Sequence, residues 1–157
     1  MMIGNQAPQH RVVGFELDGI AYALPLAAVD RVVRAVEITP LPGAPDVILG
    51  VINVHGRVVA VADIRKRFGL LPREIELDDA IVIAHTATRR LALVANAVHG
   101  VLDYAESDIV EREQIIPESG YVEAVAKTRE GLVIIQDLDR FLDISEETSL
   151  QRAMDNA

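Results

Sequence analysis

The residues of this chain best suited to acid–base chemistry are His55 and Asp63, which stand at either end of an apolar run. The stretch from 50 to 68 reads GVINVHGRVVAVADIRKRF. An imidazole supported by a carboxylate can take a proton from a nucleophile. No serine lies in a nucleophile-elbow motif, and the chain has no cysteine. Catalysis by the pair would need a nucleophile from elsewhere, and both side chains within hydrogen-bond reach beside a cleft.

Other patterns that carry chemistry are incomplete. Lys66 and Lys127 lack the glycine-rich context of a phosphate-binding loop. The four histidines form no i, i+4 pair with a supporting carboxylate, so the sequence predicts no zinc site. Asp103, Glu106 and Asp108 lack the register of a calcium-binding loop, and we interpret them as a solvated face. We expect a protein that is not an enzyme and that holds no metal and no cofactor.

Composition narrows the class of protein further. The chain of 157 residues is 50% hydrophobic and rich in Val, Ile and Ala, which suits one domain, or two small lobes, built of packed strands. A net charge of −9 disfavours nucleic acid, because a phosphate backbone repels an acidic surface. The absence of cysteine agrees with a reducing compartment. With no secretory signal and no apolar run of about 20 residues, we expect a cytoplasmic protein without direct membrane insertion.

Alternating apolar residues and turn signals predict a series of β-hairpins. Asp18-Gly19 is a strong two-residue hairpin signal, and His55-Gly56 stands between two apolar runs in the same way. Many short strands at this spacing favour an all-β barrel or sandwich. The predicted strand pairs are 12–17 with 21–26, 50–54 with 57–62, 80–85 with 90–95, and 121–127 with 131–136.

Helices are predicted only where strands end. Short helical signals cover 63–68 and 137–142, and each opens with an aspartate that can cap the helix N-terminus. A last amphipathic helix is predicted at 145–154, with Ser145 as its cap. The segment 38–48 carries three prolines and a glycine, so it is predicted to be a loop.

The sequence repeats itself, which predicts a duplicated half-domain. Residues 22–33 align with 91–102 and match at five of twelve positions. Farther along, 58–68 aligns with 132–142, in the same order and at a similar offset. A half of about 70 residues buries too little surface to be stable alone. We therefore expect the two halves to pack on each other through a shared apolar seam.

One segment of the repeat suggests a groove for a partner. Residues 27–38 place valines among charged residues, which predicts one helical turn followed by a strand. One interpretation is that all of these valines belong to the core. The other is that some stay exposed, and that Val29 and Val32, with their repeat equivalents Val98 and Val101, line a groove between the lobes.

A basic stretch follows the apolar run in this otherwise acidic chain. Such a run is either a solvated face of the fold or a surface that steers an acidic partner. Its members are Arg57, Arg65, Lys66, Arg67 and Arg73.

Five stretches of the chain, taken in order, carry a family resemblance. They are FELDGIAYALPL (15–26), VDRVVR (29–34), ITPLPGAP (38–45), GVINVHGRVVAVADIR (50–65) and DLDRFL (137–142). In order and spacing they resemble the CheW family of chemotaxis coupling proteins, although no single stretch is specific by itself. The resemblance runs from about Val12 to about Arg152.

The resemblance implies an all-β fold of two pseudo-symmetric, five-stranded β-barrel lobes on a shared hydrophobic core. Short helices, including one at the C-terminus, would complete it. A single domain would span 8–154. Lobe one would cover about 12–75, with contributions from the C-terminal segment, and lobe two about 79–143. Residues 1–7 and 155–157 would be flexible tails.

The resemblance also implies a scaffold that works by contact. It would join the cytoplasmic tip of a chemoreceptor to the regulatory domain of a CheA-type histidine kinase, in the cytoplasm at membrane-associated receptor arrays. Kinase contacts would come from loops and strand ends, with Gly50, Asn53 and Gly56 as the expected residues. The receptor would occupy the groove, whose expected residues are Val29, Arg31, Val32, His55, Val98 and Val101.

The segment around His55 departs from the family pattern. The family usually has Asn-Leu-Arg-Gly where this chain has Asn-Val-His-Gly. Histidine offers fewer donors than arginine and titrates near neutrality, so the anchoring that the arginine supplies is weakened or made pH-sensitive here. Ala60 also replaces a usual proline, and Asn96 a common aspartate. We expect His55 to form a hairpin turn and to take part in the partner surface.

Three other functions stay open at this point. A CheW-like adaptor could serve a non-flagellar pathway, such as twitching motility or cyclic-nucleotide output. A small-molecule-binding β-barrel would need a sizeable enclosed pocket with converging polar groups. Catalysis by His55 and Asp63 would need the geometry described above.

Overall fold

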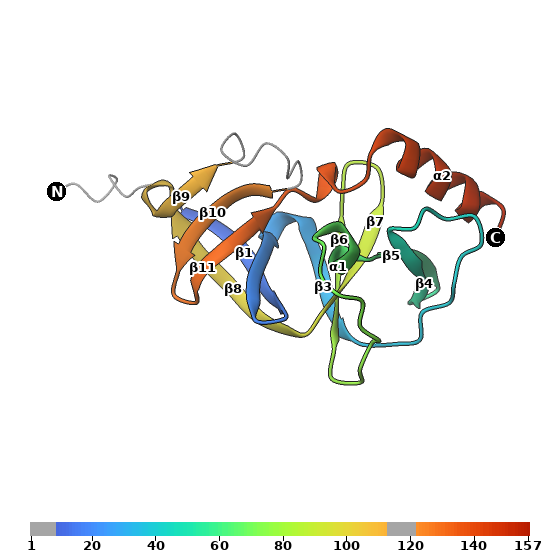
Figure 1. The fold of residues 1–157 in the computed structure, drawn as a ribbon, viewed down its shortest axis with the longest axis horizontal. Coiled ribbons are helices and arrows are strands. Elements are labelled where there is room, and N and C mark those ends of the chain that lie inside the picture. The colour runs from blue at the N-terminus through green and yellow to red at the C-terminus, as the bar shows by residue number, and fades with distance from the viewer. Residues whose placement is uncertain (1–8, 113–121) are drawn as a thin grey trace.

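The computed structural model describes residues 9–112 and 122–157. Strands dominate it, and short helices follow them (Figure 1). The predicted tail at 1–7 and the first residue of the predicted strand 121–127 lie outside the described residues. The helices are α1 (Ile64–Arg67) and α2 (Ile144–Asp155), and the 3₁₀ turns are η2 (Leu26–Ala28), η3 (Glu106–Asp108) and η5 (Leu138–Arg140). The strands are β1 (Gln9–Leu17), β2 (Ile20–Pro25), β3 (Val29–Arg34), β4 (Ile48–Val54), β5 (Arg57–Ala62), β6 (Ala80–His85), β7 (Arg90–Ala95), β8 (Ala97–Ala105), β9 (Ile109–Arg112), β10 (Val122–Thr128) and β11 (Gly131–Gln136).

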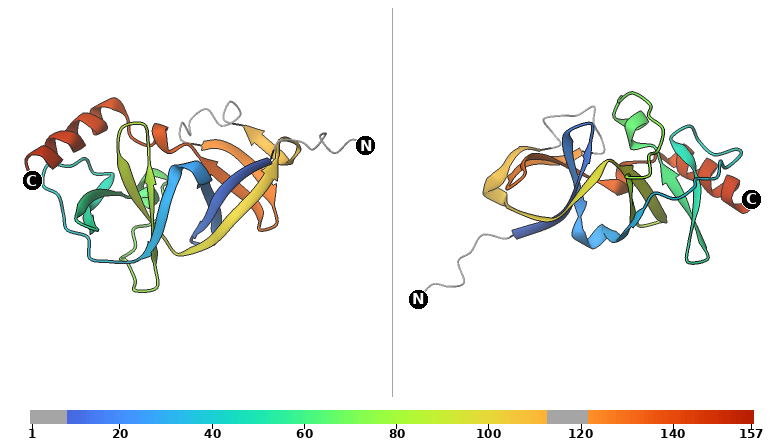
Figure 2. Two further views of the ribbon diagram at one scale, coloured as in Figure 1. Left: turned by 180° about the vertical axis from the view of Figure 1, so that it is seen from behind. Right: turned by 90° about the horizontal axis from the view of Figure 1, so that it is seen from below.

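The strands form two sheets that stand side by side (Figures 1 and 2). One sheet has the order β8-β1-β2-β11-β10-β9, and the other has the order β3-β6-β7-β5-β4. This arrangement confirms the all-β, two-lobed fold with a C-terminal helix. One lobe differs from the prediction because it has six described strands instead of five. In the five-stranded lobe, a single bridge between Thr39 and Val51 takes the place of the sixth strand.

The lobes exchange strands, which corrects the predicted division of the chain. The resemblance implies one lobe at about 12–75, with contributions from the C-terminal segment, and another at about 79–143. In the structure, β1 and β2 leave the first half to join the six-stranded sheet, and β6 and β7 join the five-stranded one. Two parallel pairings, β2 with β11 and β5 with β7, complete the exchange. Parallel strands cannot be joined by a tight turn, so they bring together segments far apart in sequence.

The register of the two parallel pairings agrees with the duplication. In the five-stranded lobe, Ala60 of β5 lies opposite Leu91 of β7. In the six-stranded lobe, Ile134 of β11 lies opposite Tyr22 of β2. In the repeat alignment, Ala60 is equivalent to Ile134 and Leu91 is equivalent to Tyr22, so the two pairs occupy equivalent positions. The two halves therefore adopt the same pattern, and each half completes the other's sheet.

Each inner strand divides its side chains between two hydrophobic cores. On β7, Leu91 and Leu93 are buried between the lobes, whereas Ala92 points into the interior of the five-stranded lobe. Leu102 and Ile135 belong to the matching interior of the six-stranded lobe. Successive side chains of a strand point to opposite faces, so a slip by one residue would exchange the two sets. Both cores together fix the register.

The core between the lobes also holds the C-terminal segment. Phe15 and Leu24 enter it from the six-stranded lobe, and Leu93 enters it from the five-stranded lobe. Phe141, which follows η5, and Leu150 of α2 complete it, both buried. The shared apolar seam predicted from the repeat is therefore present, and α2 packs on it (Figure 1).

The basic stretch does not form a single surface that could steer an acidic partner, because two of its arginines form ion pairs within the fold. Arg65 of α1 pairs with Asp18 in the β1–β2 turn at 2.5 Å, across the two lobes. Arg67 pairs with Glu146 of α2 at 2.6 Å. These arginines are used inside the fold, because they tie α1 to the other lobe and to the C-terminal helix.

The predicted hairpins and most of the predicted caps are confirmed. All four predicted pairs of strands are joined by their turns, at 18–19, 55–56, 86–89 and 129–130. Asp63 caps α1 by accepting a hydrogen bond from the backbone N–H of Lys66 at 3.1 Å. Asp137 caps η5 in the same way.

The C-terminal helix begins earlier than predicted. Asp143, not Ser145, is its cap and accepts a hydrogen bond from the backbone N–H of Glu146 at 2.7 Å. The carboxylate of Glu146 in turn accepts a hydrogen bond from the Asp143 N–H, which makes a capping box. The predicted tail at 155–157 continues the helix end, because the Asn156 N–H donates to the Arg152 carbonyl.

A buried ion pair holds the segment that leads into β6. Asp79 is only 4% exposed and accepts hydrogen bonds from Arg73 and from the backbone N–H of Glu76, both at 2.8 Å. Its carbonyl accepts from the N–H of Ala35 at 3.0 Å. Burial alone would raise the pKa of Asp79, but the hydrogen bonds from Arg73 and Glu76 outweigh it, so the pKa lies below its usual value.

Because each lobe takes strands from both halves, fragments 1–78 and 79–157 are each expected to be unfolded alone. Each fragment lacks strands that cover its apolar faces. Mixed together, they are expected to fold, since the missing pairings are then restored. Proton–nitrogen NMR spectra of the separate and mixed fragments measure this. A dispersed spectrum from either fragment alone would contradict the exchange of strands.

The Asp79 ion pair predicts a loss of stability in acid. Since the pKa of Asp79 is lower in the folded protein, the unfolded chain binds its proton more readily. The contribution is complete above about pH 5 and is lost as the pH falls below about 4. Asp79→Asn is expected to be about 1–3 kcal/mol less stable near pH 7, and to lose less stability than the unmodified protein on acidification. Urea denaturation at several pH values checks this, and parallel losses would contradict it.

Candidate protein-binding site

The stretch Asn53-Val54-His55-Gly56 forms the tight turn between β4 and β5. His55 and Gly56 have φ angles of 51° and 83°, which are both positive, as in a type I′ turn. The side-chain oxygen of Asn53 accepts a hydrogen bond from the Gly56 N–H at 2.8 Å. His55 is exposed. The turn thus presents an imidazole where backbone geometry favours glycine or asparagine.

Beside this turn, the five-stranded lobe opens in a hollow of about 520 Å³. The hollow lies between the start of β3 and the β4–β5 hairpin, which carry the two edges of the sheet. Val29 and Val54 line it, together with Val59 and Ile83. The last two also belong to the interior core of the lobe, so the hollow is the mouth of that lobe. We call it the lobe-mouth groove.

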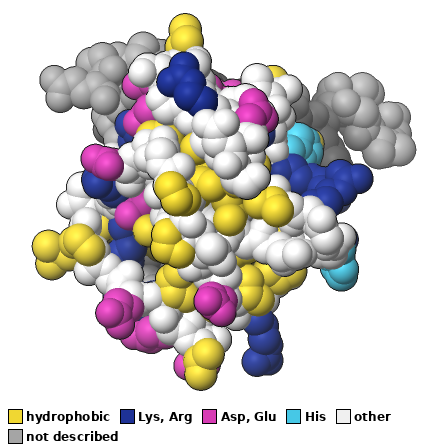
Figure 3. All heavy atoms as spheres, turned by 90° about the vertical axis from the view of Figure 1, so that its right-hand side faces the viewer, with side chains coloured by type: hydrophobic (Ala, Val, Ile, Leu, Met, Phe, Trp, Pro, Cys, Tyr) yellow, Lys and Arg dark blue, Asp and Glu magenta, His cyan; other side chains and the backbone are white. Residues whose placement is uncertain are grey.

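The lobe-mouth groove carries more positive than negative charge, although the chain has a net charge of −9. Asp30 is the acidic residue of its lining, and it contacts His85 at 2.8 Å and Arg90 at 3.3 Å. Charge is uneven over this end of the molecule, where Figure 3 shows histidine and basic side chains at the right edge and acidic ones at the lower left. The basic residues of the lining are Arg31, His55, Arg57 and Arg90.

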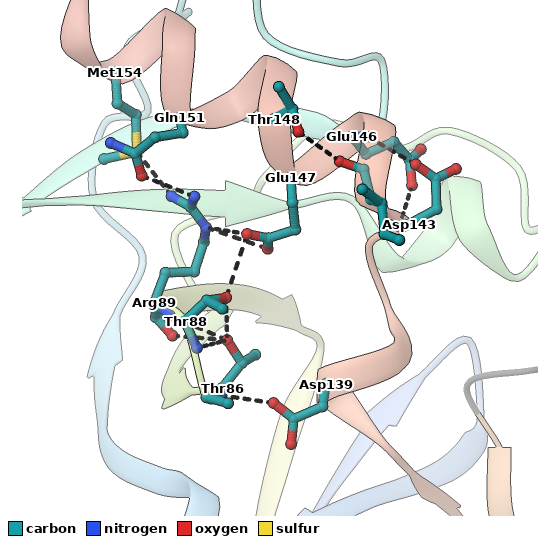
Figure 4. Close-up of polar contacts among 12 residues, drawn as sticks. Thr86, Thr88, Arg89, Asp139, Asp143, Glu146, Glu147, Thr148, Gln151 and Met154 are labelled. Carbon is teal, nitrogen blue, oxygen red and sulfur yellow. Dashed lines mark hydrogen bonds and ion pairs between the residues drawn. The ribbon is translucent and has the colours of Figure 1, made fainter.

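The β6–β7 turn beside the groove is clamped to α2. Arg89 lies 3.0 Å from a carboxylate oxygen of Glu147 and donates a hydrogen bond to the side chain of Gln151 at 3.0 Å (Figure 4). Its side chain is nearly buried. The clamp fixes the start of β7, and so positions Arg90 against Asp30.

The structure brings together three of the residues predicted to bind the receptor. Val29, Arg31 and His55 all line the lobe-mouth groove. This hollow is the mouth of one lobe, whereas the predicted groove lies between the two lobes, and the place where a receptor binds stays a prediction. Val32, the fourth residue of β3, is not among the residues that line it.

The two predicted residues of the second repeat lie in the other sheet. Val98 and Val101 belong to β8, where Val98 packs against the shared core and Val101 is exposed. Val32 and Val36 are exposed as well, so the interpretation of all four valines of 27–38 as core is wrong. The predicted helical turn followed by a strand is confirmed by η2 and β3. That the valines line a groove between the lobes stays a prediction.

The residues predicted to bind the kinase do not form a separate surface. Asn53 and Gly56 belong to the same turn as His55, which is predicted to bind the receptor. Gly50 is buried, and a Cβ added there would overlap the Thr39 carbonyl oxygen and lie 2.8 Å from its carbon. Gly50 therefore acts in the packing of β4 and offers no surface to a partner.

The geometry rules out catalysis by His55 and Asp63. The two residues stand at opposite ends of β5, and six residues of strand span about 20 Å. Asp63 is also occupied as the cap of α1. Within 9–112 and 122–157, no group of three or more His, Asp and Glu side chains is placed to hold a metal ion. None of the helices described there has the length and apolar character needed to cross a membrane.

Sequence reasoning missed Asp30, His85 and Arg90. They come from three strands, since Asp30 lies on β3, His85 ends β6 and Arg90 begins β7. Asp30 meets the other two only because β3 pairs with β6. The turn at 86–89 was the available signal, since it predicts that His85 and Arg90 are neighbours across a hairpin.

Comparison with known proteins identifies similar chains along almost the whole length. A family model described as CheW-like domain matches residues 11–146. The chemotaxis protein CheW of Bacillus subtilis is 28% identical over 149 residues, which cover 94% of each chain. That of Thermotoga maritima is 26% identical, over 90% of this chain and 93% of its own. The crystal structure of the scaffolding protein TtCheW from Thermoanaerobacter tengcongensis matches with a TM-score of 0.78 and 31% identity, covering 88% of this chain and 96% of that chain.

Gly50→Ala is expected to destabilise the protein by about 2–4 kcal/mol, because the new Cβ meets backbone that cannot move away. Gly56→Ala is the matched control. It has a positive φ too, but nothing lies within 4 Å of an added Cβ, so a loss of only about 1 kcal/mol is expected. Urea denaturation measures both. Equal losses would show that backbone conformation, and not the contact with Thr39, dominates at Gly50.

Proposed function

This chain belongs to the family of CheW-like domains, and from this premise we propose that it is a coupling protein of chemotaxis. It joins the cytoplasmic tip of a chemoreceptor to the regulatory domain of a CheA-type histidine kinase. It works as a scaffold and not as an enzyme, since it holds its two partners by contact and modifies neither. The names of its relatives, chemotaxis protein CheW and scaffolding protein, support this proposal.

The observation that carries the proposal is a set of equivalent apolar positions on the two lobes. Val32 of the five-stranded lobe and its repeat equivalent Val101 of the other lobe are 42% and 43% exposed. Val58 and its equivalent Leu132 are 56% and 57% exposed. Single exposed apolar side chains are common on protein surfaces, but here the same exposed positions recur on both lobes. Two lobes that share one core can therefore offer two similar contact surfaces at a fixed separation, as a connector requires.

The receptor tip occupies the lobe-mouth groove and contacts Val29, Arg31 and His55. The groove combines an apolar floor with a basic rim, so it suits a segment that carries both apolar and acidic side chains. Asp30 is shared by His85 and Arg90. The charge of Arg31 is thus not balanced within the groove, and it can pair with a carboxylate of the receptor.

The kinase domain binds at strand ends outside this groove. The six-stranded lobe offers Leu132, next to the β10–β11 turn, as an exposed apolar anchor. Asn53 and Gly56 shape the turn that presents His55, and so they act on the receptor side. We infer a cytoplasmic protein that reaches membrane-associated arrays through its receptor, with no part for nucleic acid.

The proposal predicts that changes in the groove weaken receptor binding without unfolding the protein. His55→Ala and Arg31→Glu remove a donor and reverse a charge at the groove. Each is expected to weaken binding of the receptor tip by at least about 5-fold, which is about 1 kcal/mol. The melting temperature should stay nearly unchanged, because both side chains are exposed. Isothermal titration with the receptor tip and with the kinase regulatory domain measures binding.

Arg34→Glu is the matched control for Arg31→Glu. It makes the same change on the same strand, at an exposed residue outside the groove lining, so receptor binding should change by less than about 2-fold. Equal effects at positions 31 and 34 would remove the groove from the receptor surface. Failure of the unmodified protein to bind either partner would remove the coupling function itself. A large drop in melting temperature for His55→Ala would make that histidine structural.

A further inference from the structure

The five-stranded lobe has a second hollow, which lies beyond the end of β3. Its volume is about 470 Å³, and it is bounded by residues 35–38, by Leu49 of β4 and by residues 73–77. The lobe-mouth groove uses residues 29–31 at the start of the same strand. The length of β3, about 20 Å, therefore separates the two hollows. We call the second one the acidic-rim groove.

The acidic-rim groove gathers exposed apolar side chains from three segments. Leu77 is 89% exposed, and Val36, Leu49 and Ile75 are between 37% and 46% exposed. Single exposed apolar residues are common on protein surfaces, but contiguous ones mark interaction sites. All four line one hollow. Their grouping is what a docking surface for another molecule requires.

The segment that displays Ile75 and Leu77 is held at both ends. Upstream, the guanidinium of Arg65 donates a hydrogen bond to the Leu71 carbonyl at 2.9 Å. Downstream, the buried Asp79 binds Arg73 and ties the segment to Ala35. Because the backbone is fixed on either side, the exposure of Leu77 is a property of the folded state.

The rim of this groove is negatively charged. Glu37, Glu74 and Glu76 line it, and all three are exposed. Arg73 is the basic residue of the lining, and it is already paired with Asp79 at 2.8 Å and with Glu76 at 3.4 Å. The charge of the rim is therefore opposite to that of the lobe-mouth groove, and it selects for a different partner.

We propose that the acidic-rim groove docks a basic amphipathic segment of a partner protein, in which Lys or Arg flanks a row of Leu or Ile. The apolar row covers Leu77 and its neighbours, and the cations meet Glu37 and Glu74. An anionic membrane is the other surface that attracts exposed leucines, but carboxylates on the rim repel lipid phosphates. The groove is independent of the surfaces in the proposed coupling function, so either proposal can fail alone.

The test uses the full chain and a fluorescein-labelled peptide of Leu and Lys at amphipathic helical spacing, about 18 residues long. Fluorescence anisotropy in about 0.15 M salt measures its binding, because salt at that concentration screens diffuse attraction to an acidic protein. Leu77→Ser is compared with Leu71→Ser, which changes another leucine of the same segment, 81% exposed but outside the groove lining. A double variant of the rim, Glu37→Gln with Glu74→Gln, removes two negative charges. Its control is a double variant outside the groove lining, Asp46→Asn with Glu130→Gln, which changes the net charge equally.

We expect Leu77→Ser and the double variant of Glu37 and Glu74 each to weaken binding of the peptide by at least about 5-fold. Each of the two controls is expected to change binding by less than about 2-fold. A peptide with Glu in place of Lys should not bind. Three results would overturn the proposal: no saturable binding, equal effects of the groove variants and their controls, or equal binding of the Glu peptide. Binding to phosphatidylserine vesicles that Leu77→Ser abolishes would also overturn it, in favour of a membrane.

Discussion

The burial of one face of each sheet against the other is the constraint on which this structure depends. Leu91 and Leu93 of β7, Phe15 of β1 and Leu150 of α2 all meet in that interface. The same strands turn their alternate side chains into the lobe interiors, so each sheet is apolar on both faces. Neither lobe could keep its strands in register without the other. The hairpins, the helices and both grooves rest on this double use of each strand.

The stability of the fold is mostly hydrophobic, and the polar contacts fix where segments of the chain lie. Arg65 ties α1 to the β1–β2 turn of the other lobe, and Arg89 ties the β6–β7 turn to α2. Ion pairs of this kind contribute modestly to stability, but they hold chain segments in one place. The effect is clear in the five-stranded lobe, where a basic groove and an acidic groove face opposite ends of β3. The fold keeps these opposite charges apart.

Local features of the sequence predicted local structure well, whereas long-range pairing was beyond them. Asp18-Gly19 and His55-Gly56 specify hairpins because two-residue turns need a positive φ. Asp63 is correctly predicted as a cap, while Ser145 is not, since Asp143 forms the reciprocal pair with Glu146. The parallel pairings were not predicted, because hydrophobic patterning shows which face of a strand is buried but not which strand lies beside it. For the same reason, the sequence singled out Val29, Arg31 and His55 but did not predict the lobe-mouth groove that all three line.

The exchange of strands between the lobes has a consequence during synthesis. The last residue of β2 leaves the ribosome about 100 residues before the first residue of β11, its parallel neighbour. At about 5–20 residues per second, the nascent hairpin waits on the order of 5–20 s with one sheet edge uncovered. The native topology of this sheet therefore forms only after β11 has left the ribosome, and until then the edge of β2 is open to pairing with other strands.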